Sequence, residues 1–189
     1  MRIIVAITGA SGVVLGSRLV EFLKYKENKG KYELHLITSK SAKKIAEYEE
    51  VNLDESRSFA DYCYEEDELD SSISSSSYRI DSMVIIPCSM KTMAAIANGF
   101  CDNLITRAAE NILKLGKKLV VVPRDTPLSL AAIENMRKLK SCGVLIVPPN
   151  MAYYYKPKTV GDVTNFFVGK VLDVLRIEHN LYNKWKGGD

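Results

Sequence analysis

The sequence lacks the features that mark several common classes of protein. Its four cysteines form no Cys-x-x-Cys pair, and no signal peptide precedes the first predicted strand, so we expect free thiols in a reducing cytoplasm. No apolar run approaches the ~20 residues that cross a bilayer, which predicts no membrane span. Lysine and arginine number 26 against 23 acidic residues, an excess too small and too scattered to favour nucleic acid. Any anion-binding site must therefore be local.

The sequence has enough hydrophobic residues to form the core of one domain. The chain has 189 residues, of which 47% are hydrophobic, so it can bury a sizeable core. We expect a single domain covering residues 1–189.

Strands alternate with helices along the chain. Apolar runs predict strands at 3–7, 32–37, 83–86, 118–122 and 144–147. Helices are predicted after Gly12 and at 39–50 with Ser41 as N-cap, 89–97 with Ser89 as N-cap, 103–115, 128–140 and 160–179, with a polar turn at 24–31. This order predicts an α/β fold of the flavodoxin-like or Rossmann-like kind: three layers, with a central parallel sheet and helices on both faces.

The least regular part is the segment 53–77. It holds an acidic run followed by a tract of serines, a composition typical of a flexible linker. Because it is short and precedes an apolar strand, we expect instead a loop that passes close to a ligand.

The first strand ends in a glycine-rich turn that leads into a helix. The glycines are Gly9, Gly12 and Gly16, a spacing that matches neither G-x-G-x-x-G nor the P-loop. Such a turn directs backbone N–H groups at an anion, so we interpret it as a phosphate cradle. The second strand ends in Thr38-Ser39 rather than in an acid, which disfavours a nicotinamide cofactor and leaves a mononucleotide open.

The unusual residues directly follow predicted strands. They are Gly9 to Ser11, Ser39, Pro87 to Thr92, Arg124 and the tyrosine loop 153–155. Parallel strands bring their carboxyl ends to one edge of a sheet, so we expect these loops to converge on one ligand. Arg124, between Pro123 and Pro127, is well held for a phosphate.

Four other charged residues have an unremarkable interpretation when taken alone. Glu49 is typical of an exposed glutamate near a helix end. Arg107, Lys114 and Lys170 are typical of solvated cations on helix surfaces.

Several motifs in order resemble those of the UbiX-type flavin prenyltransferases, over nearly all of the chain. They are Thr8-Gly9-Ala10-Ser11-Gly12, Ser39-Lys40, Pro87-Cys88-Ser89-Met90-Lys91-Thr92, Asp102 to Ala109, Val122 to Leu128, and Tyr154 with Lys156-Pro157. The resemblance implies a metal-independent enzyme that joins the dimethylallyl group of dimethylallyl phosphate to reduced FMN. Its product would be the cofactor of a UbiD-type decarboxylase. The resemblance also implies a homo-oligomer, such as a dodecamer, with sites between subunits.

The same resemblance assigns roles to individual residues. The flavin site would consist of Gly9, Ala10, Ser11, Ser39, Ser89, Met90, Lys91, Thr92 and Arg124. The prenyl phosphate would be held by Tyr154, Lys170 and Arg124, with Arg107 and Lys114 from a neighbouring subunit. Ser11 would relay a proton, Glu49 would act as general acid or base, and Tyr154 with Lys170 would neutralise the leaving phosphate.

The chain departs from the family in one loop, and two alternative functions stay open. Some members place an aromatic residue in the loop before the third strand, where a π-face shelters the allylic cation, but this chain offers only Leu69, Ile73 and Tyr78 there. An FMN-dependent cysteine decarboxylase would need a histidine, and only His35 and His179 exist. A non-catalytic flavin-binding subunit of an aromatic acid decarboxylase would keep the flavin motifs without needing Tyr154, Lys170 or Glu49.

Overall fold

The computed structural model describes residues 1–25, 28, 30–185 and 187. Its strands are β1 Arg2–Ile7, β2 Glu33–Thr38, β3 Tyr62–Glu65, β4 Ser82–Cys88, β5 Lys118–Pro123 and β6 Leu145–Ile146. Its helices are α1 Val13–Lys24, α2 Lys40–Tyr48, α3 Leu53–Phe59, α4 Met90–Ala97, α5 Leu104–Lys114, α6 Leu130–Ser141 and α7 Val160–Leu175, with a 3-10 turn η2 at Ser72–Ser74. The polar turn predicted at 24–31 falls in part on residues 26, 27 and 29, which lie outside the described residues.

The strands form one parallel sheet of six, in the order β3-β2-β1-β4-β5-β6. The central strand β1 pairs with β2 and β4, placing Val5 beside Leu36 and Val84. β1, β2 and β4 are apolar along almost their whole length because both of their faces are buried. The predicted fold class is confirmed.

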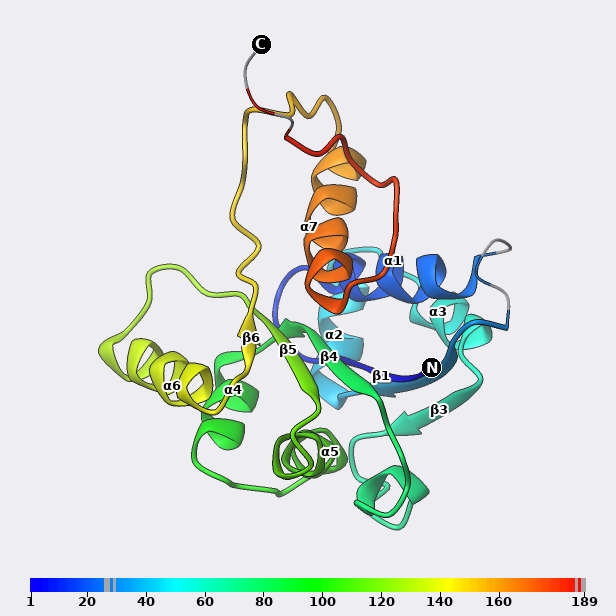
Figure 1. Ribbon diagram of the computed structural model, residues 1–189, viewed down its shortest axis with the longest axis vertical. Helices are drawn as coiled ribbons and strands as arrows, with labels where there is room; N and C mark the ends of the chain where they lie inside the picture. Colours follow the sequence, from blue (N-terminus) through cyan, green and yellow to red (C-terminus); the bar gives the residue numbers. More distant parts are fainter. Residues whose placement is uncertain (26–27, 29, 186, 188–189) are drawn as a thin grey trace.

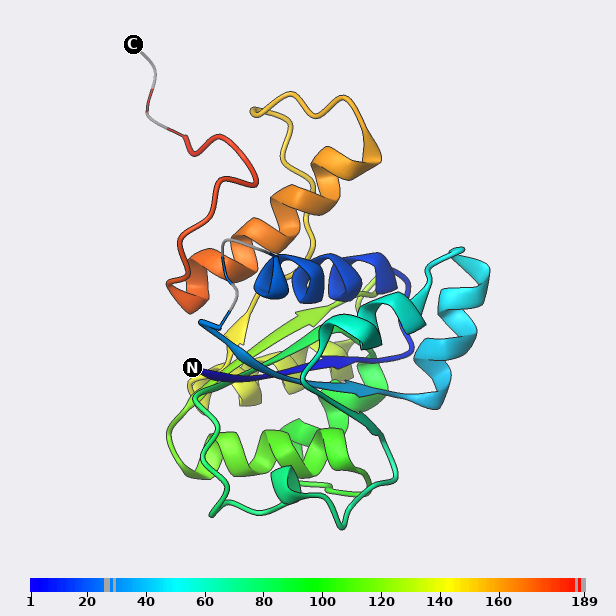
Figure 2. The ribbon, with the colours of Figure 1, turned by 90° about the vertical axis from the view of Figure 1, so that its right-hand side faces the viewer.

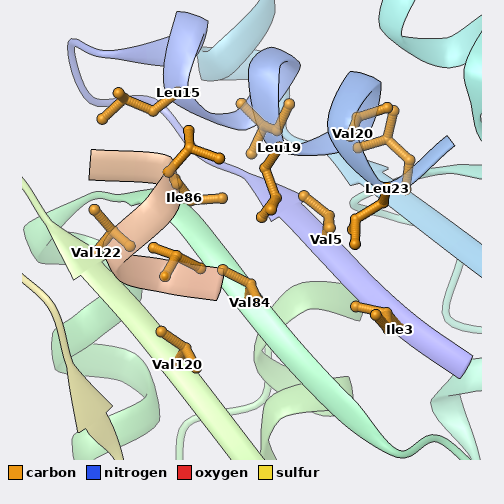
Figure 3. Packing of buried hydrophobic residues seen from close by; sticks show 14 of the residues in the cluster. Ile3, Val5, Leu15, Leu19, Val20, Leu23, Val84, Ile86, Val120 and Val122 are labelled. Atoms are coloured by element: carbon orange, nitrogen blue, oxygen red, sulfur yellow. The ribbon is translucent and has the colours of Figure 1, made fainter. Parts of the chain in front are cut away.

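Helices cover both faces of this sheet (Figures 1 and 2). One core lies between the sheet and helices α1, α2, α3 and α7, where Val5 and Ile86 meet Leu19 (Figure 3). The other core lies between the sheet and α4, α5 and α6, and contains Ile85 and Ile105. Alternate residues of each strand enter opposite cores, which produces three layers.

The segment 53–77 is more regular than the sequence predicted. It contains α3 and the edge strand β3, so the sheet has one strand more than expected. The helix is capped by Asn52, whose side chain accepts hydrogen bonds from the amides of Asp54 and Glu55. The strand is only half-buried and has four residues. Short polar elements of this kind carry little periodicity, which explains why they were missed.

Three predicted boundaries also differ. α7 ends at Leu175 rather than at 179, because Arg176 adopts a left-handed conformation with φ 63 and ends the helix. α6 begins at Leu130 after an N-cap at Ser129, two residues later than predicted. β6 has only two residues, because Pro148 and Pro149 follow it closely.

After β6 the chain leaves the sheet. The segment 148–159 runs away from the strands and returns only through α7, which packs against α1 (Figures 1 and 2). We call residues 148–159 together with α7 the arm. The carboxyl edge of the sheet and the arm are therefore two separate places for functional residues.

Candidate functional site

The carboxyl edge of the sheet is held together by one threonine. Thr8 follows β1 and is buried. Its hydroxyl donates to the carbonyl oxygen of Pro87 at 2.8 Å and accepts from the amide of Ser89 at 2.8 Å. The turn after β1 is thus fastened to the loop that begins α4. We call this region, formed by residues 8–12, 39–41, 87–92 and 124, the rim.

Thr8→Val should therefore loosen the rim. Valine keeps the shape but leaves the Ser89 amide without a partner, so we expect a loss of about 2 kcal/mol in the free energy of unfolding. Thr8→Ser keeps the hydroxyl and should lose about 1 kcal/mol or less, the cost of one methyl group. Denaturant unfolding of both variants measures the difference. A valine variant as stable as the serine variant would contradict this role of the hydroxyl.

The turn after β1 also packs closely on α2. A Cβ atom at Gly9 would lie 2.3 Å from the Oγ of Ser41, so only glycine fits there. The predicted N-cap Ser41 is wrong, because Ser39 caps α2 by accepting from the amide of Ala42 at 3.0 Å. Ser41 lies two residues further on, in the first turn of α2, against Gly9.

The predicted phosphate cradle at the start of α1 is filled by a side chain of the protein. Glu49 accepts from the amide of Gly12 at 2.7 Å and from the amide of Val13 at 2.9 Å. A carboxylate at a helix N-terminus is stabilised by the helix dipole. These two amides are therefore not available to a phosphate. The sequence predicted an exposed Glu49, but its side chain is half-buried and held by these two hydrogen bonds.

The start of α4 remains as the candidate anion site on the rim. Ser89 caps the helix by accepting from the amide of Thr92 at 3.3 Å, and its hydroxyl donates to the Oγ1 of Thr92 at 3.0 Å. Among the described residues, no partner is found for the amides of Met90 and Lys91. Free amides at a helix N-terminus are donors suited to a phosphate.

Arg124 lies next to this helix start. Its backbone amide donates to the carbonyl oxygen of Cys88 at 3.3 Å, which fixes the loop after β5 beside the loop after β4. Its side chain is exposed. The rim thus brings together the residues predicted for the flavin: Gly9, Ala10, Ser11, Ser39, Ser89, Met90, Lys91, Thr92 and Arg124. Cys88 in the same loop is no nucleophile, because burial raises the pKa of its thiol to about 12.

Tyr154 and Lys170 lie on the arm rather than on the rim. The Tyr154 ring meets the rings of Phe166 and Trp185 edge-on, with centroids 6.2 and 5.5 Å apart. The Lys170 ammonium lies 5.2 Å from the centroid of the same Phe166 ring. The two predicted phosphate ligands therefore share one aromatic cluster. The prediction that the tyrosine loop joins the other loops at one edge is wrong within a single chain, because the prolines after β6 lead the chain outwards.

Arg107 and Lys114 project from α5 on the other face of the sheet. The Arg107 Nε donates to the carbonyl oxygen of Ser74 at 3.1 Å, and Asn111 donates to the same oxygen at 2.8 Å. Both bonds fasten the serine tract to α5, while Lys114 is exposed in the last turn. The serine tract is therefore an ordered loop.

Both histidines lie in closed clusters. The His35 ring stacks on Tyr62 with centroids 4.7 Å apart, and its nitrogens lie 3.2 Å from Tyr64 and from Glu33. Burial lowers the pKa of His35 against the opposing pull of Glu33, so the ring stays neutral. His179 packs on α7, hydrogen-bonded to Asp173. Neither is free to serve a histidine-dependent decarboxylase, which disfavours that alternative.

Sequence reasoning missed two groups of residues. Thr8 was seen only as part of a motif, and its tie to Ser89 depends on two loops far apart in sequence. Asp173 and Tyr182 were not singled out, although they form a hydrogen bond beside Lys170. A tyrosine and an aspartate with no motif around them carry no signal that could have been detected.

Two features are absent from the described residues. No cluster of three or more histidine, cysteine, aspartate or glutamate side chains that could hold a metal ion was found there. Nor does this part of the chain contain a helix of the length and apolar character needed to cross a membrane.

Comparison with known proteins gives consistent matches. Residues 1–172 match the Flavoprotein family. The flavin prenyltransferase UbiX of Saccharolobus solfataricus is 47% identical over 190 residues, spanning 98% of this chain and 92% of that protein. The structure of AnUbiX (PadA1) in complex with FMN and dimethylallyl pyrophosphate has a TM-score of 0.94 and 39% identity, covering 100% of this chain and 98% of that one. The dodecameric FMN-dependent UbiX-like decarboxylase of Escherichia coli O157:H7 has a TM-score of 0.94 and 42% identity, with 99% and 100% covered.

Proposed function

This chain belongs to the Flavoprotein family and, within it, to the UbiX-type flavin prenyltransferases, and we propose that it joins the dimethylallyl group of dimethylallyl phosphate to reduced FMN. The product, prenylated FMN, would serve a UbiD-type decarboxylase as its cofactor. The observation that carries the proposal is Lys170, whose ammonium lies against aromatic rings, with no carboxylate partner found among the described residues. Such a cation keeps its charge available for a phosphate.

The rim supplies the groups that FMN needs. We propose that the FMN phosphate binds the amides of Met90 and Lys91 at the start of α4, with the Arg124 guanidinium beside them. Ser39 and the turn 9–11 would line the rest of the flavin.

The prenyl phosphate needs positive charge at the moment of bond breaking. The allylic C–O bond of the donor breaks, and the electron pair leaves with the phosphate. Lys170 and the Tyr154 hydroxyl would neutralise that phosphate, with Arg107 and Lys114 adding charge, so no metal ion is required. Bound reduced FMN supplies the electron-rich ring that accepts the five-carbon group.

Ser11 and Glu49 would move protons during ring closure. The Ser11 side chain is exposed at the rim. Its neighbour Gly12 is held by Glu49, which also holds Val13. We therefore propose that Glu49 fixes the Ser11 turn in addition to its expected role as general acid or base.

The two halves of the site would meet between copies of the chain. Tyr154 and Lys170 belong to the arm, whose helix α7 packs against α1, whereas Ser11 and Arg124 belong to the rim, in the loops that follow β1 and β5 (Figure 2). We propose that the arm of one copy completes the rim of another in a symmetric assembly. The dodecameric relative supports this arrangement.

We also propose one domain for residues 1–189, since both cores share one sheet and neither can form without it. The four cysteines are free thiols, which supports a reducing cytoplasm as the compartment.

The mass of the flavin after incubation tests the proposed reaction. Incubating the purified protein with reduced FMN and dimethylallyl phosphate should raise the flavin mass by one five-carbon unit. Boiled protein serves as the control. An unchanged flavin together with decarboxylation of a cysteine-bearing peptide would favour the cysteine decarboxylase, and an unchanged flavin without it would leave a flavin-binding subunit.

A further inference from the structure

The chain after α7 folds back along that helix. The turn at Arg176 is closed by its amide, which donates to the carbonyl oxygen of Asp173 at 3.0 Å. The amide of Ile177 donates to the carbonyl oxygen of Leu172 at 2.9 Å, and the Ile177 side chain is buried. We call residues 177–185 the tail. In Figures 1 and 2 the tail lies beside α7.

One carboxylate on α7 holds the tail. Asp173 accepts from the hydroxyl of Tyr182, from the Nζ of Lys184 at 2.7 Å and from the Nε2 of His179 at 3.2 Å. The His179 Nδ1 accepts from the amide of Leu181, which leaves the proton on Nε2. Burial raises the pKa of Asp173, but these three hydrogen bonds together lower it below its ordinary value. The carboxylate is charged and fully engaged.

A glycine makes room for the tail. A Cβ atom at Gly169 would lie 2.5 and 2.6 Å from two carbons of the Tyr182 ring and 2.9 Å from the His179 ring. The Tyr182 ring thus occupies the space that any other residue at 169 would fill. Gly169 directly precedes Lys170 on the helix.

The docked ring forms one side of the Lys170 site. The Lys170 ammonium lies 4.7 Å from the Tyr182 centroid and 5.2 Å from the Phe166 centroid, distances at which a cation is attracted to a π-face. Asp173 is three residues further along the same helix, a spacing that allows a helix ion pair. Its three bonds to the tail keep it from neutralising the lysine.

We propose that the tail positions Lys170 for the prenyl phosphate. The Tyr182 ring supports the ammonium, and the hydrogen-bond donors of the tail hold the Asp173 carboxylate away from the ammonium. Tyr182 and Asp173 are positioning residues, since neither needs to touch the substrate. This inference rests on the proposed function, because it concerns the phosphate ligand of that reaction. A lysine that is held on rings rather than on an acid is pre-oriented without a competing carboxylate, which favours phosphate binding.

Four variants separate this role from a merely structural one. Tyr182→Leu removes the ring, and Gly169→Ala displaces it while keeping the tyrosine. Tyr182→Phe keeps the ring and loses the hydroxyl. Ser141→Ala is the control, because Ser141 is exposed on α6, outside both the rim and the arm.

We expect the variants that remove or displace the ring to change KM and not kcat. Tyr182→Leu and Gly169→Ala should raise the KM for dimethylallyl phosphate by about tenfold, while kcat and the Kd for FMN change by less than about threefold. Tyr182→Phe should stay within about threefold in KM, and Ser141→Ala should match the wild type. Unchanged KM values in both Tyr182→Leu and Gly169→Ala would overturn the proposal.

A second readout does not depend on turnover. In the wild type the aromatic rings should shift the NMR signals of the Lys170 ε-methylene protons, assigned by their disappearance in Lys170→Arg. The shift should shrink in Tyr182→Leu and Gly169→Ala and persist in Tyr182→Phe. A shift that persists in all variants refutes the support by the tail. A wild type that never prenylates FMN refutes the proposed function instead, and the NMR shift still decides whether the tail holds the lysine.

Discussion

We expect the substitution Gly16→Ala to destabilise the protein by about 3 kcal/mol, which lowers the melting temperature by roughly 6 to 12 °C. Gly16 lies in α1, where an added Cβ would be 2.5 Å from the carbonyl oxygen of Ile86 and 2.8 Å from the Ile7 side chain. The carbonyl oxygen belongs to the backbone of β4 and cannot rotate away. α1 would have to move off the sheet, and the core between them would open (Figure 3).

The same substitution at an open position of another helix should not destabilise the protein. At Gly161, in the exposed first turn of α7, the new methyl group meets only ordinary contacts, so Gly161→Ala should be neutral or stabilising by up to about 1 kcal/mol. Calorimetry of both variants gives the comparison. If Gly16→Ala unfolds at the wild-type temperature, α1 does not pack on β4 as described.

The largest expected effect on activity belongs to Lys170. Lys170→Met keeps the length and the apolar stem but removes the ammonium, so the departing phosphate loses its principal cation. We expect kcat/KM for prenyl transfer to fall by about 100- to 1000-fold, the range seen when one charge-stabilising donor is removed. The Kd for FMN should stay within about twofold of the wild type, because the flavin ligands lie on the rim. Steady-state kinetics and flavin titration measure the two quantities.

Lys140→Met provides the matched control for that variant. Lys140 is exposed on α6, remote from both the rim and the arm, and its replacement should leave kcat/KM unchanged. A mixed assembly gives a further test. Lys170→Met chains and Arg124→Ala chains should each be inactive, yet regain activity when assembled together, if the arm of one copy serves the rim of another. A loss of less than threefold in Lys170→Met would remove that lysine from the site.

Much of the rim could be predicted from the sequence, since strand and loop are local in the chain. Apolar runs identified β1, β2, β4 and β5, and parallel pairing required the loops after them to meet. The error at Ser41 shows the limit of this reasoning. Ser39 and Ser41 are both good N-caps by type, and only the close packing of Gly9 on Ser41 distinguishes them.

Glu49 shows a different limit. By position it lies at the C-terminal end of α2, where a carboxylate is disfavoured by the dipole of its own helix. Its carboxylate is nevertheless satisfied, because the N-terminus of another helix, α1, lies within hydrogen-bonding distance. No periodicity in the sequence carries information on which helix ends meet.

Composition and the order of apolar runs were sufficient to predict an α/β fold in which the loops after β1, β2, β4 and β5 meet at one edge of the sheet, and motifs were sufficient to identify the family. Both are encoded by residues that are neighbours in the chain. Three arrangements depended on the tertiary structure: the filling of the α1 N-terminus by Glu49, the separation of the arm from the rim, and the docking of the tail beside Lys170. Each joins residues from different elements. Many other pairs of residues have the same local propensities, so only the packing of the whole chain determines which of them come into contact.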